Sequence, residues 1–161
     1  MKITLRVENG DTFENVQHEI SKIKIHQITK SLAVIKDIFG IVQSDESLKA
    51  AFGEFMNSVG EEEASDQSGE DLMVKLIGAY ETLLLNLPDK AIELLSALSG
   101  IEKDIVMAQD VEDVFDIYDA VVEENDIEKL INRAKKSLAV TKQKIRFKKL
   151  AEKATATTTQ Q

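Results

Sequence analysis

The residue types that most often carry chemistry are few in this chain, and their spacing matches no catalytic motif. There is no cysteine, and the two histidines, His18 and His26, lie eight residues apart without an HExxH pattern, so we interpret both as structural. The seven glycines form neither a GxGxxG nor a GxxxxGK[ST] phosphate-binding motif, and no GxSxG nucleophile motif is present. The sequence therefore predicts a protein that is not an enzyme and that takes no cofactor or metal.

Carboxylates recur every three residues at Asp110, Asp113, Asp116 and Asp119. An EF-hand loop needs oxygen ligands at alternate positions and a glycine at the sixth, where this chain has Phe115. A spacing of three instead places the side chains along one flank of a helix. We interpret them as a solvated acidic helix face.

The strongest functional signal is the distribution of charge along the chain. Residues 1–132 carry 11 Lys/Arg against 28 Asp/Glu, a charge of −17, whereas residues 133–161 carry 9 against 1, a charge of +8. Three interpretations of the basic segment stay open: a solvated helix end, a binding site for an acidic protein surface, and a nucleic-acid site. The last is disfavoured because the acidic remainder repels phosphate and Phe147 is the one aromatic residue of the segment. The candidate partner-binding residues are Arg133, Lys135, Lys136, Lys142, Lys144, Arg146, Lys148 and Lys149.

A β-hairpin is expected at the start of the chain. Ile3, Leu5 and Val7 alternate with polar residues, as in a strand with one apolar face. Asn9-Gly10 is a preferred two-residue hairpin turn, after which residues 12–16 can return as the second strand. A lone hairpin is marginal in water, so we expect it to pack on helices or on another copy of the protein.

Helical periodicity follows the hairpin. Apolar residues at 28, 32, 35, 38 and 39 predict a helix whose C-cap is Gly40, and Ser44 is expected to cap a second helix that reaches residue 59. Residues 22–25 are either a short third strand or the beginning of the first helix. Further apolar stripes, with Pro88 at a first helical turn, predict helices at about 72–84, 88–98, 110–122 and 126–138.

These elements place the chain in the α+β class, predominantly α-helical, with an N-terminal β-hairpin followed by about six helices. We expect a hairpin and two helices at 1–59, an acidic flexible linker at 60–70, a helical region ending in a basic helix at 71–152, and a disordered tail at 153–161. Whether the two halves pack together stays open. No apolar stretch approaches the roughly 20 residues of a membrane span, so we expect a soluble, cytosolic protein without membrane contact.

Several segments carry a resemblance to a known family. They are the strand at 2–7 with the Thr12-Phe13 pair, the basic and apolar helix around 30–38, and the segments LLSALSGI (94–101), VFDIYDAV (114–121) and ENDIEKL (124–130). Taken in order along the chain, they resemble the tail assembly chaperones of long-tailed, siphovirus-like bacteriophages of Gram-positive hosts.

This resemblance implies a non-enzymatic protein that coats and solubilises the tape measure protein during tail assembly and is displaced by tail tube subunits. It implies the tape measure protein and the tail tube protein as partners, and a place in the cytoplasm of the infected host instead of the mature virion. Self-association is also expected, because an acidic body and a basic tail favour head-to-tail contact. Two alternatives stay open: a tail structural or completion protein, and a helical nucleic-acid-binding regulator.

Overall fold

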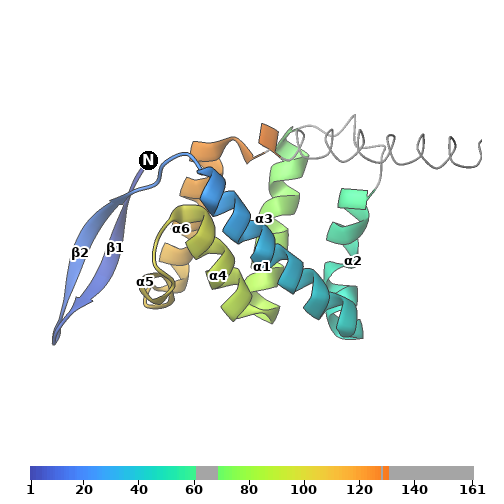
Figure 1. Cartoon of the computed structure of the whole chain (residues 1–161), viewed down its shortest axis with the longest axis horizontal. Coiled ribbons are helices and arrows are strands. Elements are labelled where there is room, and N and C mark those ends of the chain that lie inside the picture. Colours follow the sequence, from blue (N-terminus) through green and yellow to red (C-terminus); the bar gives the residue numbers. More distant parts are fainter. Residues whose placement is uncertain (61–68, 128, 131–161) are drawn as a thin grey trace, which may run out of the picture. The chain divides into compact units, whose positions relative to one another are not determined.

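The computed structural model describes residues 1–60, 69–127, 129 and 130. It confirms the predicted class, because an antiparallel β-hairpin precedes a set of helices (Figure 1). The strands are β1 (Lys2–Asn9) and β2 (Thr12–Glu19). The helices are α1 (Ile25–Ser44), α2 (Glu46–Gly60), α3 (Gly69–Asn86), α4 (Pro88–Ser99), α5 (Lys103–Met107) and α6 (Val111–Asn125).

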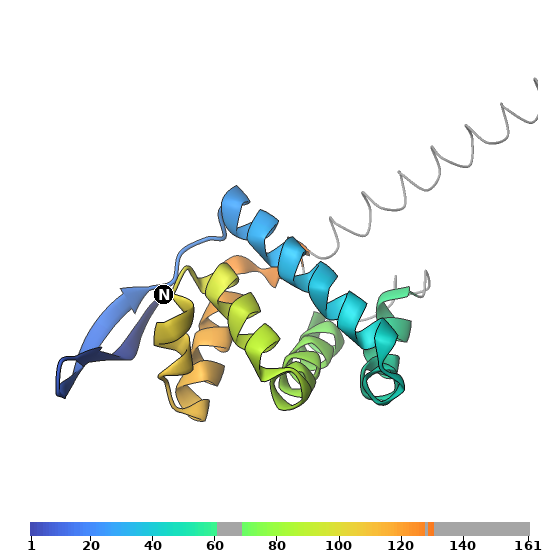
Figure 2. The same ribbon diagram turned by 60° about the horizontal axis from the view of Figure 1, so that its bottom comes forward.

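Two compact units divide the chain, residues 1–125 and residues 126–161. The first contains the hairpin and α1–α6, and within it α1 packs along α4, so the two halves of the sequence share one unit (Figure 2). Most of the predicted linker lies outside the described residues, although α2 continues to Gly60 and α3 begins at Gly69. The predicted disordered tail and almost all of the predicted basic helix lie outside the described residues as well.

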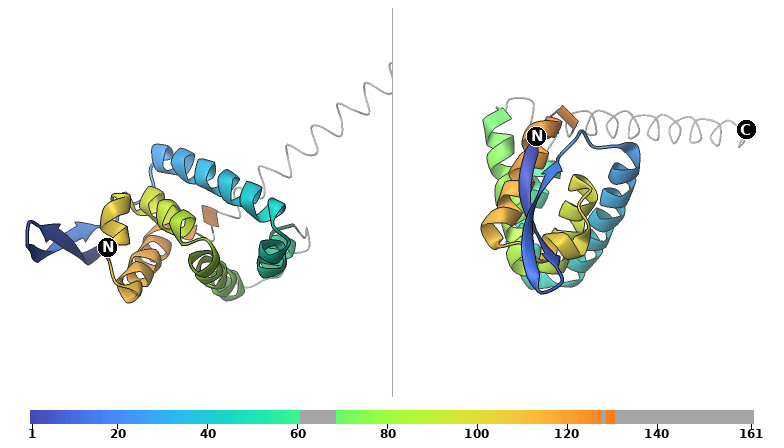
Figure 3. Two further views of the ribbon diagram at one scale, coloured as in Figure 1. Left: turned by 90° about the horizontal axis from the view of Figure 1, so that it is seen from below. Right: turned by 90° about the vertical axis from the view of Figure 1, so that its left-hand side faces the viewer.

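The hairpin projects from one end of the helices of the first unit (Figures 1 and 3). Its two strands pair without a bulge from Lys2↔Glu19 to Asn9↔Thr12. The turn consists of Gly10 and Asp11, and Gly10 has φ +65°. The predicted Asn9-Gly10 turn is therefore displaced by one residue. Glycine takes the first central position, where a type II′ turn needs a positive φ that glycine adopts without strain.

Helix α1 continues through Gly40, so this glycine is not the C-cap that the sequence predicted. An added Cβ at Gly40 would meet nothing within 4 Å, which means that nothing around this position requires a glycine. Residues 22–24 belong to the loop that leads into the helix. The cap of α2 is Asp45 in place of the predicted Ser44, because the Asp45 carboxylate accepts the backbone N–H groups of Ser47 (2.8 Å) and Leu48 (3.2 Å).

The core of the first unit is aliphatic, with two stacked tyrosine rings. Tyr80 of α3 lies parallel to Tyr118 of α6, with ring centroids 4.3 Å apart, and the Tyr80 hydroxyl donates to the Ala91 carbonyl (3.3 Å). Pro88 begins α4, and Gly100 ends it with φ +77°, both as predicted. The short helix α5 was not predicted. The largest fully buried side chains are Ile20, Leu95, Val106, Ile117 and Val121.

Amide side chains join segments that are distant in the sequence. Gln109 accepts a hydrogen bond from the Arg6 backbone N–H (2.9 Å) and donates to the Arg6 carbonyl (2.7 Å). Asn125 accepts from the Ile23 N–H (2.6 Å), beside the end of the hairpin. Because these amides satisfy backbone groups that would otherwise lack partners, they fix the hairpin against α5 and α6.

Candidate partner-binding site

The structure leaves an apolar stripe of α1 in solvent. We call it the α1 stripe: Ile25, Ile28 and Leu32, which are 83%, 41% and 59% exposed. Their spacing of three and four residues places them on one face of the helix, and half-buried Ile35 and Phe39 continue that face. The apolar pattern predicted the helix correctly, but it did not indicate which face of the helix would be covered.

The buried face of α1 contains two polar residues. Gln27 and Ser31 are buried together with Val34 and Val42. The Gln27 amide donates to the Leu98 carbonyl (3.0 Å) and accepts from the Lys24 N–H (2.8 Å), while the Ser31 hydroxyl donates to the Gln27 carbonyl (2.7 Å). Polar groups that have hydrogen-bond partners can be buried at low cost, so α1 packs on α4 through this face and its apolar stripe stays outside.

The surroundings of the α1 stripe are basic. Lys24, just before the helix, and Lys36 lie at the two borders of the stripe and are exposed, and Lys22 is exposed in the loop before α1. Lys30 is exposed as well but lies on the side of α1 that faces α4. The single acid of the helix, Asp37, is paired with Lys90 of α4 (3.3 Å). An apolar stripe bordered by lysines favours a partner helix whose own apolar stripe is bordered by carboxylates.

Helix α6 has an acidic outer face. Four exposed carboxylates follow one another about one turn apart along one side: Glu112, Asp116, Asp119 and Glu123. Partial burial, and then the neighbouring charges of Asp116 and Glu123, raise the pKa of Asp119 above its ordinary value. Of the predicted series, Asp110 precedes the helix and Asp113 is half-buried. Among the described residues, no group of three or more His, Cys, Asp or Glu side chains could hold a metal ion.

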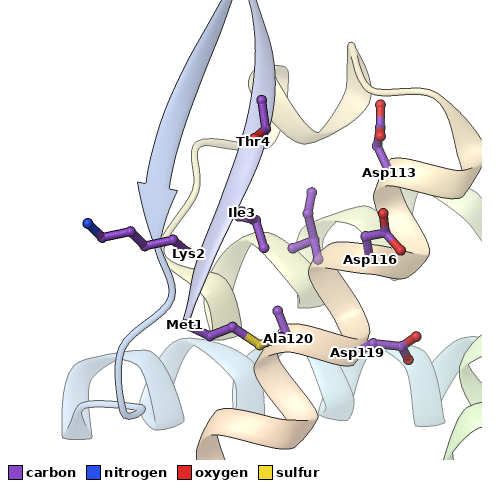
Figure 4. A pocket seen from close by; sticks show the side chains of 9 residues that line it. Met1, Lys2, Ile3, Thr4, Asp113, Asp116, Asp119 and Ala120 are labelled. Carbon is purple, nitrogen blue, oxygen red and sulfur yellow. The ribbon is translucent and has the colours of Figure 1, made fainter.

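A hollow of about 370 Å³ lies between β1 and α6 (Figure 4). Its lining includes Lys2 and Thr4 of β1 and the carboxylates Asp113, Asp116 and Asp119 of α6. The described residues around it bring no histidine to these carboxylates.

A second hollow, of about 490 Å³, lies between α1 and α4. Its lining mixes charges of both signs: Lys30 and Asp37 lie on α1 beside His26, and Glu93 and Glu102 lie on and just after α4. His26 is exposed and His18 is half-buried. The mixed charge gives this hollow no preference for either an anion or a cation.

The eight cations that the sequence singled out, from Arg133 to Lys149, lie outside the described residues and remain a prediction. The α1 stripe was missed as a surface because periodicity identifies a helix without saying which face is covered.

Within the described ranges, no helix combines the length and hydropathy needed to cross a bilayer. No family model matches this chain, and neither the curated proteins nor the solved structures include one with significant similarity to it.

Proposed function

We propose that the protein is a non-enzymatic tail assembly chaperone of a long-tailed bacteriophage, and that it keeps the tape measure protein soluble in the host cytoplasm until tail tube subunits replace it. The α1 stripe carries this proposal. A chaperone of a long amphipathic protein needs an open apolar surface that a client helix can cover and leave again. The sequence resemblance and the segregated charge of the chain support the same role.

The client-binding contact is proposed to be helix against helix. The client helix places its apolar residues on Ile28 and Leu32 and its carboxylates beside Lys24 and Lys36. Full burial of a leucine contributes about 1.5–3 kcal/mol, and Leu32 is 59% exposed, so covering it contributes about 1–2 kcal/mol. That corresponds to roughly a 5- to 30-fold change in the dissociation constant.

Two synthetic helical peptides test the contact. Both carry the same Leu/Ile stripe, bordered by glutamate in one and by lysine in the other. Fluorescence anisotropy should show tighter binding of the glutamate peptide, and Leu32→Ser should weaken it by the factor above. Leu85→Ser is the matched control, because Leu85 is 83% exposed but lies on α3. Equal binding of the two peptides, or equal effects of the two substitutions, would refute this contact.

Co-expression tests the chaperone role itself. The tape measure protein of a long-tailed bacteriophage is produced with the wild-type chain or with the double variant Ile28→Ser/Leu32→Ser, and its soluble fraction is measured. We expect the wild-type chain to raise the soluble fraction and the double variant to lose most of that effect. A soluble fraction that is the same with and without the wild-type chain would reject the proposed function.

A further inference from the structure

Strand β2 has a free edge. The Ile20 N–H donates to the Met1 carbonyl (2.7 Å), and this pair continues the register of the hairpin. Bonded and non-bonded pairs alternate in an antiparallel ladder, so the even-numbered residues of β2 bond to β1 and the odd-numbered ones direct their backbone groups outward. The outward groups belong to Phe13, Asn15, Gln17 and Glu19. In the described part of the chain, no other element forms a hydrogen bond with them.

The opposite edge of the hairpin is covered at its middle. On β1 the outward N–H and C=O groups of Arg6 are both paired with the Gln109 amide, at 2.9 and 2.7 Å. Helices α5 and α6 also pack against β1, whereas β2 lies on the far side of the hairpin from α6 (Figures 1 and 4). Among the described residues, the middle of the β1 edge is therefore covered, whereas the β2 edge is available.

Strand β2 has few of the usual protections of an exposed edge, and its only charged carboxylates are Glu14 and Glu19. Natural edge strands avoid pairing with other chains through lysine, proline, bulges or short length. β2 is eight residues long, its sequence TFENVQHE has no lysine or proline, and its register has no bulge. Its apolar face is also incompletely covered, because Leu5 is 3% exposed while Val16, directly opposite, is 44% exposed.

We propose that this edge pairs with β2 of a second copy of the chain, giving a four-stranded antiparallel sheet across a two-fold axis at Val16. This register uses the outward backbone groups of both strands. It places Val16 beside Val16 of the second copy and Glu14 beside His18 of the second copy. On the other face, Asn15 lies beside Gln17 of the second copy.

The neighbouring registers are less complementary. A two-fold axis at Asn15 would place Glu14 beside Val16 of the second copy, and an axis at Gln17 would place Val16 beside His18. Only the axis at Val16 pairs the apolar side chains with each other and the carboxylate with the imidazole. This inference rests on the hairpin and does not depend on the proposed function or on the α1 stripe.

Cysteine cross-linking tests the register, because the chain has no cysteine of its own. The two Val16 Cα atoms would form a non-hydrogen-bonded pair about 4.5 Å apart, within the range of a disulfide. Val16→Cys should therefore give a disulfide-linked dimer on mild oxidation. Glu14→Cys is the matched control, since its two copies would lie four residues apart, or about 13 Å, and should stay monomeric.

Proline substitution tests the edge. Gln17→Pro removes an outward N–H from β2, a position where an edge strand tolerates proline. Glu8→Pro removes an outward N–H from β1 and is the control for any disturbance of the hairpin. Sedimentation equilibrium should show a dimer for the wild-type chain and for Glu8→Pro, and at least about a tenfold weaker dimer for Gln17→Pro.

Salt separates this pairing from association driven by the opposite charges of residues 1–132 and 133–161. A dimer held by backbone hydrogen bonds should persist at high salt, whereas charge-driven association should be lost. Two results would overturn the proposal: a wild-type chain that stays monomeric up to about 1 mM, or cross-linking at Val16→Cys no faster than at Glu14→Cys. Faster cross-linking at position 15 or 17 would overturn the register.

Discussion

Replacement of Gln109 by methionine should loosen the hairpin from the helices. The amide makes three hydrogen bonds, to the Arg6 N–H (2.9 Å), the Arg6 carbonyl (2.7 Å) and the Ile105 carbonyl (2.8 Å). Methionine keeps the length of the side chain but removes all three bonds. A typical intramolecular hydrogen bond contributes about 0.5–1.5 kcal/mol net, so loss of the two bonds to Arg6 should lower the free energy of unfolding by about 1–3 kcal/mol.

Denaturant unfolding measures the loss of stability, and amide hydrogen exchange locates it. The Arg6 N–H should lose protection in Gln109→Met, because its acceptor is gone and its position faces water. The amide of buried Leu95 in α4 should keep most of its protection. Gln17→Met is the matched control, since Gln17 is an exposed amide of β2. A loss below about 0.5 kcal/mol with unchanged exchange at Arg6 would refute the reasoning.

Two further predictions concern the helical core. Gly100→Ala should lower the free energy of unfolding by about 1–2 kcal/mol, because φ is +77° and the new Cβ would lie 3.3 Å from the Gln27 amide nitrogen. Gly40→Ala, in open space within α1, should raise the free energy of unfolding by about 0.5–1 kcal/mol. Thermal unfolding in which Gly100→Ala and Gly40→Ala shift the melting temperature in the same direction would contradict this account. Burial raises the pKa of Tyr118 to about 12 and the pKa of Tyr80 higher still. Because the unfolded chain ionises its tyrosines near pH 10 and the folded chain does not, the contribution of both phenols to stability is complete below pH 10 and is lost as the pH rises toward 12. Phenolate absorbance should accordingly be absent from the native protein at about pH 11 and present in denaturant, and a native titration near pH 10 would contradict the buried placement.

The fold class was predictable because its signals are local. Alternation at Ile3, Leu5 and Val7 depends only on the period of a strand, and the starts of α4 and α6 follow from Pro88 and from the end of the loop at Asp110. The turn was displaced by one residue, since Asn-Gly and Gly-Asp both satisfy a two-residue hairpin. Helix α5 has five residues, which is too few for a periodic signal.

The candidate surfaces were less predictable than the elements that form them. Ile28 and Leu32 identify a helix equally well whether they face the core or solvent. Which face of α1 is buried depends on α4, whose Leu98 carbonyl accepts a hydrogen bond from the Gln27 amide. The free edge of β2 is likewise invisible in the sequence, because it depends on Gln109 and α6 reaching β1 and not β2. The cations from Arg133 to Lys149 remain a prediction of the charge distribution alone.

By itself, the sequence determined the hairpin, the succession of helices, and the segregation of charge between residues 1–132 and 133–161. These properties depend on neighbours along the chain, through the periods of strand and helix and through net charge. Only the tertiary structure decided that Gln27 and Ser31 are buried, that the α1 stripe is exposed, and that the described residues pair the backbone of Arg6 in β1 while leaving the outer edge of β2 unpaired. Those outcomes depend on which hydrogen-bond partner reaches a group from a distant part of the chain, and no local pattern encodes that partner.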